Sequence, residues 1–333
     1  MKRLLTAIKP TGDLTLGNYI GAIKPILKMQ DEYEMYMFVA NLHAITISNN
    51  PEELNIKTKK VAATYLACGI DPIKTNIFIQ SENLYHANLS WILECGTYIG
   101  ELNRMTQYKD KSKKLNDSSI TCGLYTYPVL MASDILLYDT DVVPVGEDQR
   151  QHVELARNIA IRFNGKYGAT FKVPEVVVPK QGARIKNLQD PTKKMNKSDS
   201  DTIAKGSILL LDDVNVARKK IMGAVTDSQM VVKYDVVNKP GISNLMTIYS
   251  CLEGKNFDEI EKEFDGKNYG AFKVAVANSV VKFLTDFQTK FNKIMNSKEL
   301  DNILDKGLKK AILISKPKYE AVVRKVGFMR CER

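Results

Sequence analysis

Short apolar runs alternate with helix-forming segments through the first half of the chain, and this alternation most constrains the fold. The apolar runs have the length of strands and fall at residues 3–9, 35–40, 76–80 and 142–145. The segments between them predict helices at 15–29, from 51 to about 68, and within 120–141. Strands that alternate with helices form crossover units and a parallel sheet. We therefore expect an α/β fold whose ligands bind at the carboxyl ends of the strands.

The second half of the chain has a different pattern. Residues 180–200 are polar and interrupted by Gly, Pro and Lys, which indicates a long functional loop. The later segments 214–222, 244–252, 272–291 and 298–316 have helical periodicity. A chain of 333 residues has two domains by default. We predict a Rossmann-like parallel-sheet domain over residues 1–205, which includes a lysine loop at 190–200, and an all-helical domain over residues 206–333. The C-terminal helix of the second domain can pack back on the first.

Composition excludes several classes of protein. No run of about 18 apolar residues exists, so we expect no membrane span. The apolar part of residues 1–9 is too short for a signal peptide, which favours a cytoplasmic protein. The five cysteines form no C-x-x-C pair and the three histidines no cluster, so we predict free thiols and no metal site. The net charge of +10 favours a polyanionic partner such as nucleic acid, although a Lys-rich composition gives the same excess without one.

Two short motifs indicate binding of a nucleotide. The first, Pro10-Thr11-Gly12-Asp13-Leu14-Thr15-Leu16-Gly17-Asn18, follows the first strand and opens a helix. Backbone N–H groups at such a turn bind phosphates, and the two glycines allow a close approach. A simple capped turn without a ligand has the same residue types. The second motif, Lys194-Met195-Asn196-Lys197-Ser198, places two lysines in a polar loop that can close on those phosphates. Together the motifs predict an ATP site.

The first motif resembles the first signature of the class I aminoacyl-tRNA synthetases, and the second resembles their Lys-Met-Ser-Lys-Ser signature. The tetrapeptide Thr15-Leu16-Gly17-Asn18, in place of His-Ile-Gly-His, is typical of bacterial tryptophanyl-tRNA synthetases. The resemblance also covers residues 41–46, 98–102, 146–149, 182–184 and 239–245. It extends over nearly the whole chain, which is therefore identified as resembling that family.

The resemblance implies a reaction in two steps. ATP, with Mg²⁺, activates L-tryptophan to tryptophanyl-adenylate and releases pyrophosphate, and tRNA(Trp) then receives the amino acid. It also implies a homodimer whose helical domain binds the anticodon. Catalysis needs no covalent intermediate, only positioning and stabilisation of charge. The catalytic residues implied are Thr15, Gly17, Asn18, Lys194 and Lys197. The ATP-binding residues implied are Lys9, Pro10, Thr11, Gly17, Asn18, Gly146, Glu147, Asp148, Ile185, Lys194, Met195, Asn196, Lys197 and Ser198.

The amino-acid pocket is predicted on the helix within 120–141. Tyr127, Met131 and Asp134 are spaced i, i+4 and i+7, so they share one helix face. The related tyrosyl enzymes place Gln where Met131 stands, and Met131 offers an apolar wall to an indole ring. Asp134 accepts hydrogen bonds and the indole N–H donates one, although an acidic residue here is also explained by a local helix cap. By resemblance, Tyr127 and Gln149 contact the amino group, and His43 and Leu5 line the pocket.

Some positions depart from the family pattern. Lys9 stands where bacterial members commonly have Gln, Leu5 replaces an aromatic residue, and Asn196 replaces the middle Ser of the lysine loop.

Two other functions share parts of the pattern. One is an RNA-binding paralogue that has lost catalysis, which the retained Gly17 and Lys197 argue against. The other is an adenylyltransferase, which is usually far shorter and lacks a large helical domain.

Two surfaces are expected from the same resemblance. Residues 98–100 and the helix after Ile120 are expected at a subunit interface. Basic side chains in the helical domain are expected to contact tRNA phosphates, namely Arg218, Lys219, Lys220 and Lys233.

Overall fold

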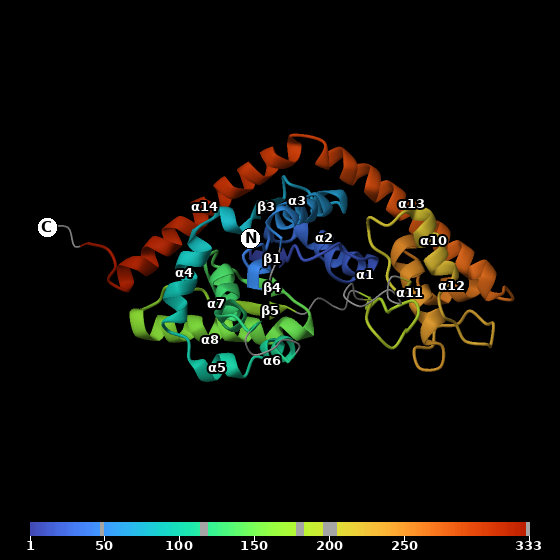
Figure 1. Cartoon of the computed structure of the whole chain (residues 1–333), viewed down its shortest axis with the longest axis horizontal. Helices are drawn as coiled ribbons and strands as arrows, with labels where there is room; N and C mark the ends of the chain where they lie inside the picture. The colour runs from blue at the N-terminus through green and yellow to red at the C-terminus, as the bar shows by residue number, and fades with distance from the viewer. Residues whose placement is uncertain (47–49, 114–118, 178–182, 196–204, 331–333) are drawn as a thin grey trace.

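A five-stranded parallel sheet forms the centre of the molecule (Figure 1). The computed structural model describes residues 1–46, 50–113, 119–177, 183–195 and 205–330. The strand order is β3-β2-β1-β4-β5. The strands are β1 (Arg3–Ile8), β2 (Glu34–Val39), β3 (Thr75–Ile79), β4 (Val142–Pro144) and β5 (Glu175–Val177). The predicted parallel sheet is confirmed, and β5 is an addition that the sequence did not indicate.

The strand order reverses between β1 and β4, and we call the region outside the carboxyl ends of these two strands the crevice. From β1 the chain moves outward to β2 and β3, and it then returns to the other side of β1 as β4. Ligands bind where the strand order reverses in this way, outside the carboxyl ends of the two diverging strands. The residues that leave β1 and β4 at this edge are Lys9 and the turn at 146–149, both of which carry predicted ATP contacts.

Helices and short helical turns complete the fold. Those of the sheet region are α1 (Leu16–Asn18), η1 (Tyr19–Ile23), α2 (Lys24–Leu27), η2 (Lys28–Asp31), η3 (Ala44–Thr46), α3 (Pro51–Ala67), η4 (Gln80–Glu82), α4 (Tyr85–Glu94), α5 (Ile99–Asn103), α6 (Thr106–Ser112), α7 (Cys122–Leu136), η6 (Glu147–Gln149) and α8 (Arg150–Tyr167). Those that follow residue 208 are α10 (Val214–Met222), α11 (Pro240–Glu253), α12 (Phe257–Glu263), α13 (Tyr269–Met295) and α14 (Glu299–Lys325).

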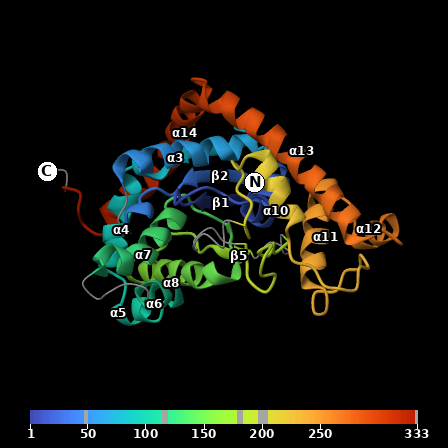
Figure 2. The ribbon, with the colours of Figure 1, turned by 45° about the vertical axis from the view of Figure 1, so that its right-hand side comes forward.

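Alternate residues of the strands build two separate cores, as the strand pleat requires. Leu4 and Met37 point into a core shared with α3, and that core continues into α10, α11 and α13. Leu5 and Phe38 point into the opposite core with α4, α7 and α8. Figure 2 shows α3 on one side of the sheet and α7 and α8 on the other. The predicted ATP site therefore lies on one face of the sheet and the predicted amino-acid pocket on the other. The two adjoin at the carboxyl edge.

The predicted helix at 15–29 is irregular in the structure. A short α1 is followed by the π turn η1, the single turn α2 and the 3-10 turn η2. Pro25 explains the break, because proline lacks the N–H that continues an α-helix and its ring presses on the preceding turn. The π turn at Tyr19–Ile23, which has more residues per turn than an α-helix, accommodates it.

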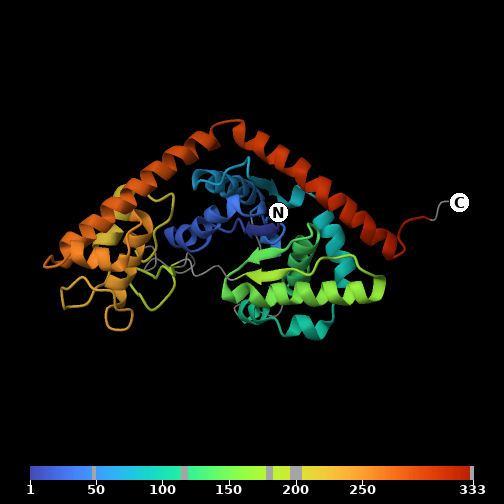
Figure 3. The same ribbon diagram turned by 180° about the vertical axis from the view of Figure 1, so that it is seen from behind.

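The last two helices form an arch over the rest of the chain (Figures 1 and 3). Helix α13 packs against α10, α11 and α3, and α14 runs along the outer strand β3 and reaches α4. The side chain of Asn76 on β3 donates a hydrogen bond of 3.0 Å to the carbonyl of Gly307 on α14. Helix α14 therefore covers the sheet edge that β3 would otherwise expose. No helix in the described part of the chain is long and apolar enough to cross a membrane.

Candidate active site

The turn after β1 carries the first motif at the carboxyl edge. Gly12 has φ of +73°, a backbone conformation that favours glycine. Thr15 and Asn18 form a capping box: the amide of Asn18 donates to Oγ1 of Thr15 at 3.1 Å, and the amide of Thr15 donates to Oδ1 of Asn18 at 2.9 Å. These side chains therefore shape the turn themselves, as the simple capped-turn interpretation requires. Thr15 is fully buried, whereas Asn18 is partly exposed and can face a ligand.

The two signature motifs meet in the structure. A Cβ on Gly17 would lie 3.4 Å from the Cβ of Met195 and 3.6 Å from that of Ile185, so this glycine gives the second motif room to approach. The amide of Met195 donates to the carbonyl of Ile185 at 3.0 Å, which closes a small hairpin. Lys194 is exposed beside it. The other predicted residues of the second motif, Asn196, Lys197 and Ser198, lie outside the described residues.

A helix of the second half of the chain holds this hairpin. The buried side chain of Asn244, on α11, pairs with both backbone groups of Lys186. The amide of Lys186 donates to Oδ1 of Asn244 at 2.8 Å, and Nδ2 of Asn244 donates to the carbonyl of Lys186 at 2.9 Å. The amide of Asn244 thus makes the two hydrogen bonds with Lys186 that the backbone of a neighbouring strand would make. Lys186 is the residue next to Ile185. The position of Ile185, a predicted ATP contact, therefore depends on α11.

On the opposite core, the helix face predicted for the amino acid surrounds a buried carboxylate. Asp134 is 2% exposed, and its Oδ2 lies 2.8 Å from Nε2 of His43. Its Oδ1 accepts from Nε2 of Gln80 at 2.7 Å and lies 2.7 Å from Nδ1 of His86. Burial raises the pKa of Asp134, but the hydrogen bonds from His43 and His86 outweigh burial and hold that pKa below its usual range. Asp134 therefore binds side chains from other elements and is not a local helix cap.

Two lysines from separate elements lie beside this pocket. Nζ of Lys111, on α6, is 4.3 Å from the ring centroid of Tyr127, a cation–π contact. Burial and the neighbouring Lys111 lower the pKa of Lys9 to about 8, and burial also lowers the pKa of Lys111. Nζ of Lys9 lies 3.5 Å from Oγ1 of Thr46. Two half-buried cations that repel each other are stabilised by an anion bound between them, so this end of the crevice suits a phosphate or a carboxylate.

Comparisons with known proteins agree with this geometry. The model of the family "tRNA synthetases class I (W and Y)" matches residues 1–285. A tryptophan–tRNA ligase of Malacoplasma penetrans is 52% identical over 331 residues, which cover 98% of each chain. This chain belongs to the bacterial tryptophanyl-tRNA synthetases. The crystal structure of the tryptophanyl-tRNA synthetase from Mycoplasma pneumoniae is 35% identical, with a TM-score of 0.88 over 98% of each chain. That of the Campylobacter jejuni enzyme, complexed with ADP and tryptophan, is 36% identical, with a TM-score of 0.84 over 98% of this chain and 99% of that one.

Not every predicted contact of this synthetase lies in the pocket itself. Leu5 is 3% exposed and packs in the core below α7, so it supports the pocket from the sheet. Gln149 donates from Nε2 to Oδ2 of Asp148 at 3.2 Å, and Asp148 also accepts from Gln107 of α6 at 3.0 Å. Asp148 and Gln149 lie with Gly146 and Glu147 in the turn after β4, and they bond each other and α6. Met131 is partly buried on the face that carries Tyr127.

Sequence reasoning missed several residues that the structure places at the site. Tyr127 shares a hydrogen bond of 3.0 Å with Nε2 of the fully buried His152. Burial, followed by the charges of Lys111 and His43, lowers the pKa of His152 to about 4. Lys111 stands among other lysines of a polar helix, so nothing in the sequence separates it from Lys109 or Lys113. Only the docking of α6 against α7 does so.

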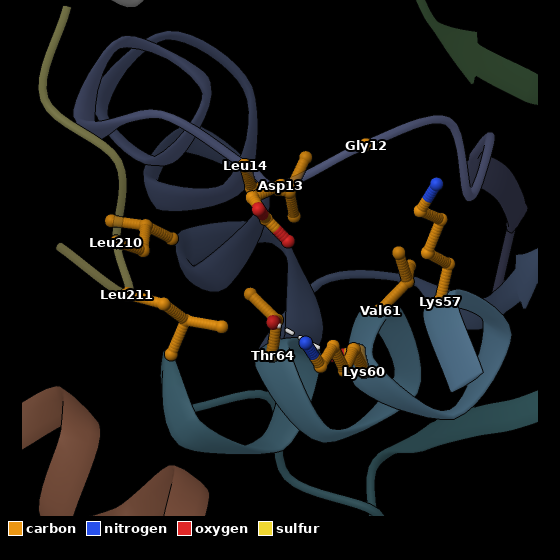
Figure 4. Close-up of a pocket in the computed structure, with 9 residues that line it drawn as sticks. All are labelled: Gly12, Asp13, Leu14, Lys57, Lys60, Val61, Thr64, Leu210 and Leu211. Atoms are coloured by element: carbon orange, nitrogen blue, oxygen red, sulfur yellow. Dashed lines mark hydrogen bonds between the residues drawn. The ribbon is translucent and has the colours of Figure 1, made fainter. Parts of the chain in front are cut away.

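One small cavity adjoins the first motif without forming a ligand site. It lies between the start of the turn and α3, as Figure 4 shows, and it holds about 10 Å³, the space of roughly one water molecule. The residues that line it are Gly12, Asp13, Leu14, Lys57, Lys60, Val61, Thr64, Leu210 and Leu211. It is far too small for a nucleotide, so it belongs to the packing behind the turn.

The expected surfaces also differ in part from the prediction. Lys220 is mostly buried, and its Nζ lies 2.7 Å from Oδ2 of Asp212, so it serves the packing of α10 and not a phosphate. Helix α7 lies between α4 and α8 and is mostly buried, so it offers little outer surface. Lys219 and Lys233 are exposed, and so are Tyr98 and Ile99. In the described residues, His, Cys, Asp and Glu form no group of three that could hold a metal ion.

Proposed function

We propose that the crevice between β1 and β4 is where this tryptophan–tRNA ligase joins L-tryptophan to ATP. The observation that carries the proposal is the half-buried pair Lys9 and Lys111 beside the pocket of Tyr127 and Asp134. The pair supplies positive charge for the carboxylate of tryptophan and for the α-phosphate, while the pocket takes the indole ring. Both groups that react are then held in one place, and positioning of this kind accounts for much of an enzyme's rate.

Tryptophan is recognised through Asp134. Its Oδ1 already accepts from Gln80 and His86, whereas Oδ2 has only His43 as a partner in the described residues. A carboxylate oxygen accepts two hydrogen bonds, so Oδ2 retains one for the indole N–H. Met131 and Tyr127 form the apolar walls. A tyrosine side chain presents a hydroxyl at a different place, so the discrimination comes from a buried acceptor that only the indole N–H reaches.

ATP lies across the meeting point of the two motifs. The adenine is next to Ile185, the ribose is next to the turn at 146–149, and the phosphates follow the backbone of the first motif. Mg²⁺ would neutralise part of the phosphate charge, and we propose no protein ligand for it. The tryptophan carboxylate attacks the α-phosphorus and the bond to the β-phosphate oxygen breaks, so pyrophosphate leaves with the negative charge. Lys194 and Lys197 stabilise that charge as it forms.

Aminoacylation of tRNA tests this proposal directly. The purified protein is given ATP, Mg²⁺, radiolabelled tryptophan or tyrosine, and transcripts of tRNA(Trp) and tRNA(Tyr). We expect label on tRNA(Trp) with tryptophan alone. A Lys111→Met variant, with Lys109→Met as the matched control on the same helix, should charge tRNA(Trp) about 100-fold more slowly if Lys111 stabilises the transition state. Equal rates for the two variants would remove Lys111 from the site.

The second half of the chain is the region proposed to bind the anticodon arm of tRNA(Trp). The exposed Lys219 and Lys233 are the phosphate contacts on the described surface there, and their replacement by Ala should weaken tRNA binding without changing the activation of tryptophan. A filter-binding assay at two salt concentrations, beside pyrophosphate exchange, separates the two effects. Because its substrates are ATP and tRNA, the enzyme is proposed to work in the cytosol.

A homodimer is proposed through the outer face of α4. Leu84, Trp91, Tyr98 and Ile99 are 70%, 65%, 63% and 69% exposed, and Leu84 and Trp91 are spaced i and i+7 on one helix face. Large apolar side chains in such a row mark an interaction surface. Light scattering should give twice the chain mass for the wild type and the chain mass for Trp91→Lys. A dimeric Trp91→Lys variant would place the interface elsewhere.

A further inference from the structure

A row of buried hydrogen bonds joins the C-terminal helix to the proposed tryptophan pocket. It begins at Ser315 on α14 and passes through Asn83 before α4, Tyr138 after α7 and His86 on α4, and it ends at Asp134. The successive distances are 2.9, 2.9, 2.7 and 2.7 Å. The five residues are between 0% and 2% exposed. A polar row of this length in a protein interior is costly to build unless every member is satisfied.

The chemistry of each group sets the direction of the row. Nδ2 of Asn83 has two protons, and it donates one to the oxygen of Ser315 and one to the hydroxyl oxygen of Tyr138. That hydroxyl accepts from Asn83 and also has Ser315 as a hydrogen-bonding neighbour, so its own proton points to Nε2 of His86. Nε2 then acts as an acceptor, so a neutral His86 carries its proton on Nδ1. That proton is donated to Oδ1 of Asp134.

The direction of these hydrogen bonds matters because a proton donated by His86 needs an acceptor. Asp134 provides one when it is ionised and its Oδ1 faces His86. With Oδ1 engaged by His86 and Gln80, the carboxylate plane is fixed and Oδ2 faces the pocket with His43. Without the Tyr138 hydroxyl, Nε2 of His86 would lose its donor, and only the Asp134 carboxylate would still favour the proton on Nδ1. An imidazole that carried its proton on Nε2 would turn a lone pair toward Oδ1 and disfavour the ionised carboxylate.

We propose that His86 and Tyr138, held from α14 by Ser315 through Asn83, are positioning residues that set the affinity and the selectivity for tryptophan. They touch no substrate and act only by orienting Asp134. This inference rests on the proposed role of Asp134 as the acceptor of the indole N–H. Helix α14, near the end of the chain, would then contribute to the amino-acid specificity of the pocket in the sheet region.

Steady-state pyrophosphate exchange with four single variants and one double variant of the full-length protein tests the inference. Tyr138→Phe removes the hydroxyl and keeps the ring. Ser315→Ala removes the far end of the row with a smaller change to the core. Asp134→Asn removes the charge. Tyr249→Phe is the control, since Tyr249 is also buried, at 6% exposed, but its hydroxyl bonds Glu263 and no member of the row. Circular dichroism melts show whether each variant is folded.

We expect the variants of the row to change the KM for tryptophan and not the KM for ATP. Tyr138→Phe should raise the KM for tryptophan up to about tenfold, as the loss of one buried hydrogen bond predicts, with the KM for ATP and kcat within about twofold. Ser315→Ala should raise the same KM about threefold, and Tyr249→Phe should change neither KM. In the double variant Asp134→Asn/Tyr138→Phe, the second change should add almost nothing, because both act through one group.

Three outcomes would overturn the inference. If Tyr138→Phe and Ser315→Ala leave the KM for tryptophan unchanged while Asp134→Asn raises it, the row is only structural and the role of Asp134 stands. If the effects of Asp134→Asn and Tyr138→Phe multiply, Tyr138 acts by another route. If Asp134→Asn itself leaves the KM unchanged, the role of Asp134 fails together with the inference.

Discussion

Gly307 on α14 offers a test in which local propensity and packing predict opposite signs. Glycine inside a helix costs about 0.5–1 kcal/mol relative to alanine, so the change Gly307→Ala should stabilise the helix by that amount if nothing else mattered. A Cβ at this position, however, would lie 2.6 Å from the carbonyl carbon of Ile77 on β3 and closer still to its oxygen. The neighbour is backbone in the sheet edge, so it cannot rotate away.

The size of the penalty follows from what must move. Helix α14 must withdraw from β3 by roughly 1.5–2 Å to reach an ordinary contact, and overpacking of this kind costs about 1–3 kcal/mol. The hydrogen bond from Asn76 to the carbonyl of Gly307 would also be lost, at about 1 kcal/mol. After the gain in helix propensity is subtracted, we expect Gly307→Ala to lower the free energy of unfolding by about 1–3 kcal/mol.

The matched control is Gly165→Ala near the end of α8. No atom lies within 4 Å of a Cβ at Gly165, so only the propensity gain remains, and that variant should be more stable by about 0.5–1 kcal/mol. Urea denaturation followed by circular dichroism, with both variants and the wild type side by side, measures the two signs. A Gly307→Ala protein as stable as the Gly165→Ala protein would refute the close packing of α14 on β3.

Three further predictions concern the site. Asp134→Asn should raise the KM for tryptophan at least about tenfold and leave the KM for ATP unchanged in pyrophosphate exchange, because the amide weakens the proposed acceptor of the indole N–H. Asn244→Ala should raise the KM for ATP about tenfold, because the backbone of Lys186 loses both partners. The affinity for tryptophan, measured by calorimetric titration, should be unchanged. The pKa of Lys9 is about 8 in the fold, below its ordinary value of 10.5, so the unfolded chain binds more protons between these values and wild-type stability should rise with pH across that window. A Lys9→Met variant, compared by urea denaturation at pH 8 and pH 10, should lack that part of the rise.

The parts of the fold that depend on local pattern could be predicted from the sequence. The apolar runs of β1 and β2 and the turn at Gly12 are read from neighbouring residues, and the i, i+4, i+7 spacing placed Tyr127, Met131 and Asp134 on one face of a real helix. Strand β5 was not predicted, because it has only three residues, begins with the charged Glu175 and lies just before the polar segment 180–200 that was interpreted as a loop. The regular helix expected at 15–29 was wrong in detail, because Pro25 overrides the apolar spacing.

What could not be predicted depends on contacts between distant residues. The partners of Asp134 come from three other segments, and His86 looked like an isolated histidine in the sequence. Asn244 stood in a family motif without a role until its amide was seen on Lys186, 58 residues earlier. Lys111 is one lysine among several until α6 docks near Lys9. Such residues carry no periodic or local signal, because only the tertiary fold brings their partners together.

The central claim, that this crevice activates tryptophan, is tested most directly by exchange of labelled pyrophosphate into ATP in the absence of tRNA. The purified wild-type protein is given ATP, Mg²⁺ and either tryptophan or tyrosine at equal concentration. The account predicts rapid exchange with tryptophan and, for tyrosine, a kcat/KM lower by about 10⁴ or more, the discrimination expected of a site built around one buried hydrogen bond. Exchange with tyrosine at a similar rate, or no exchange with tryptophan, would contradict it.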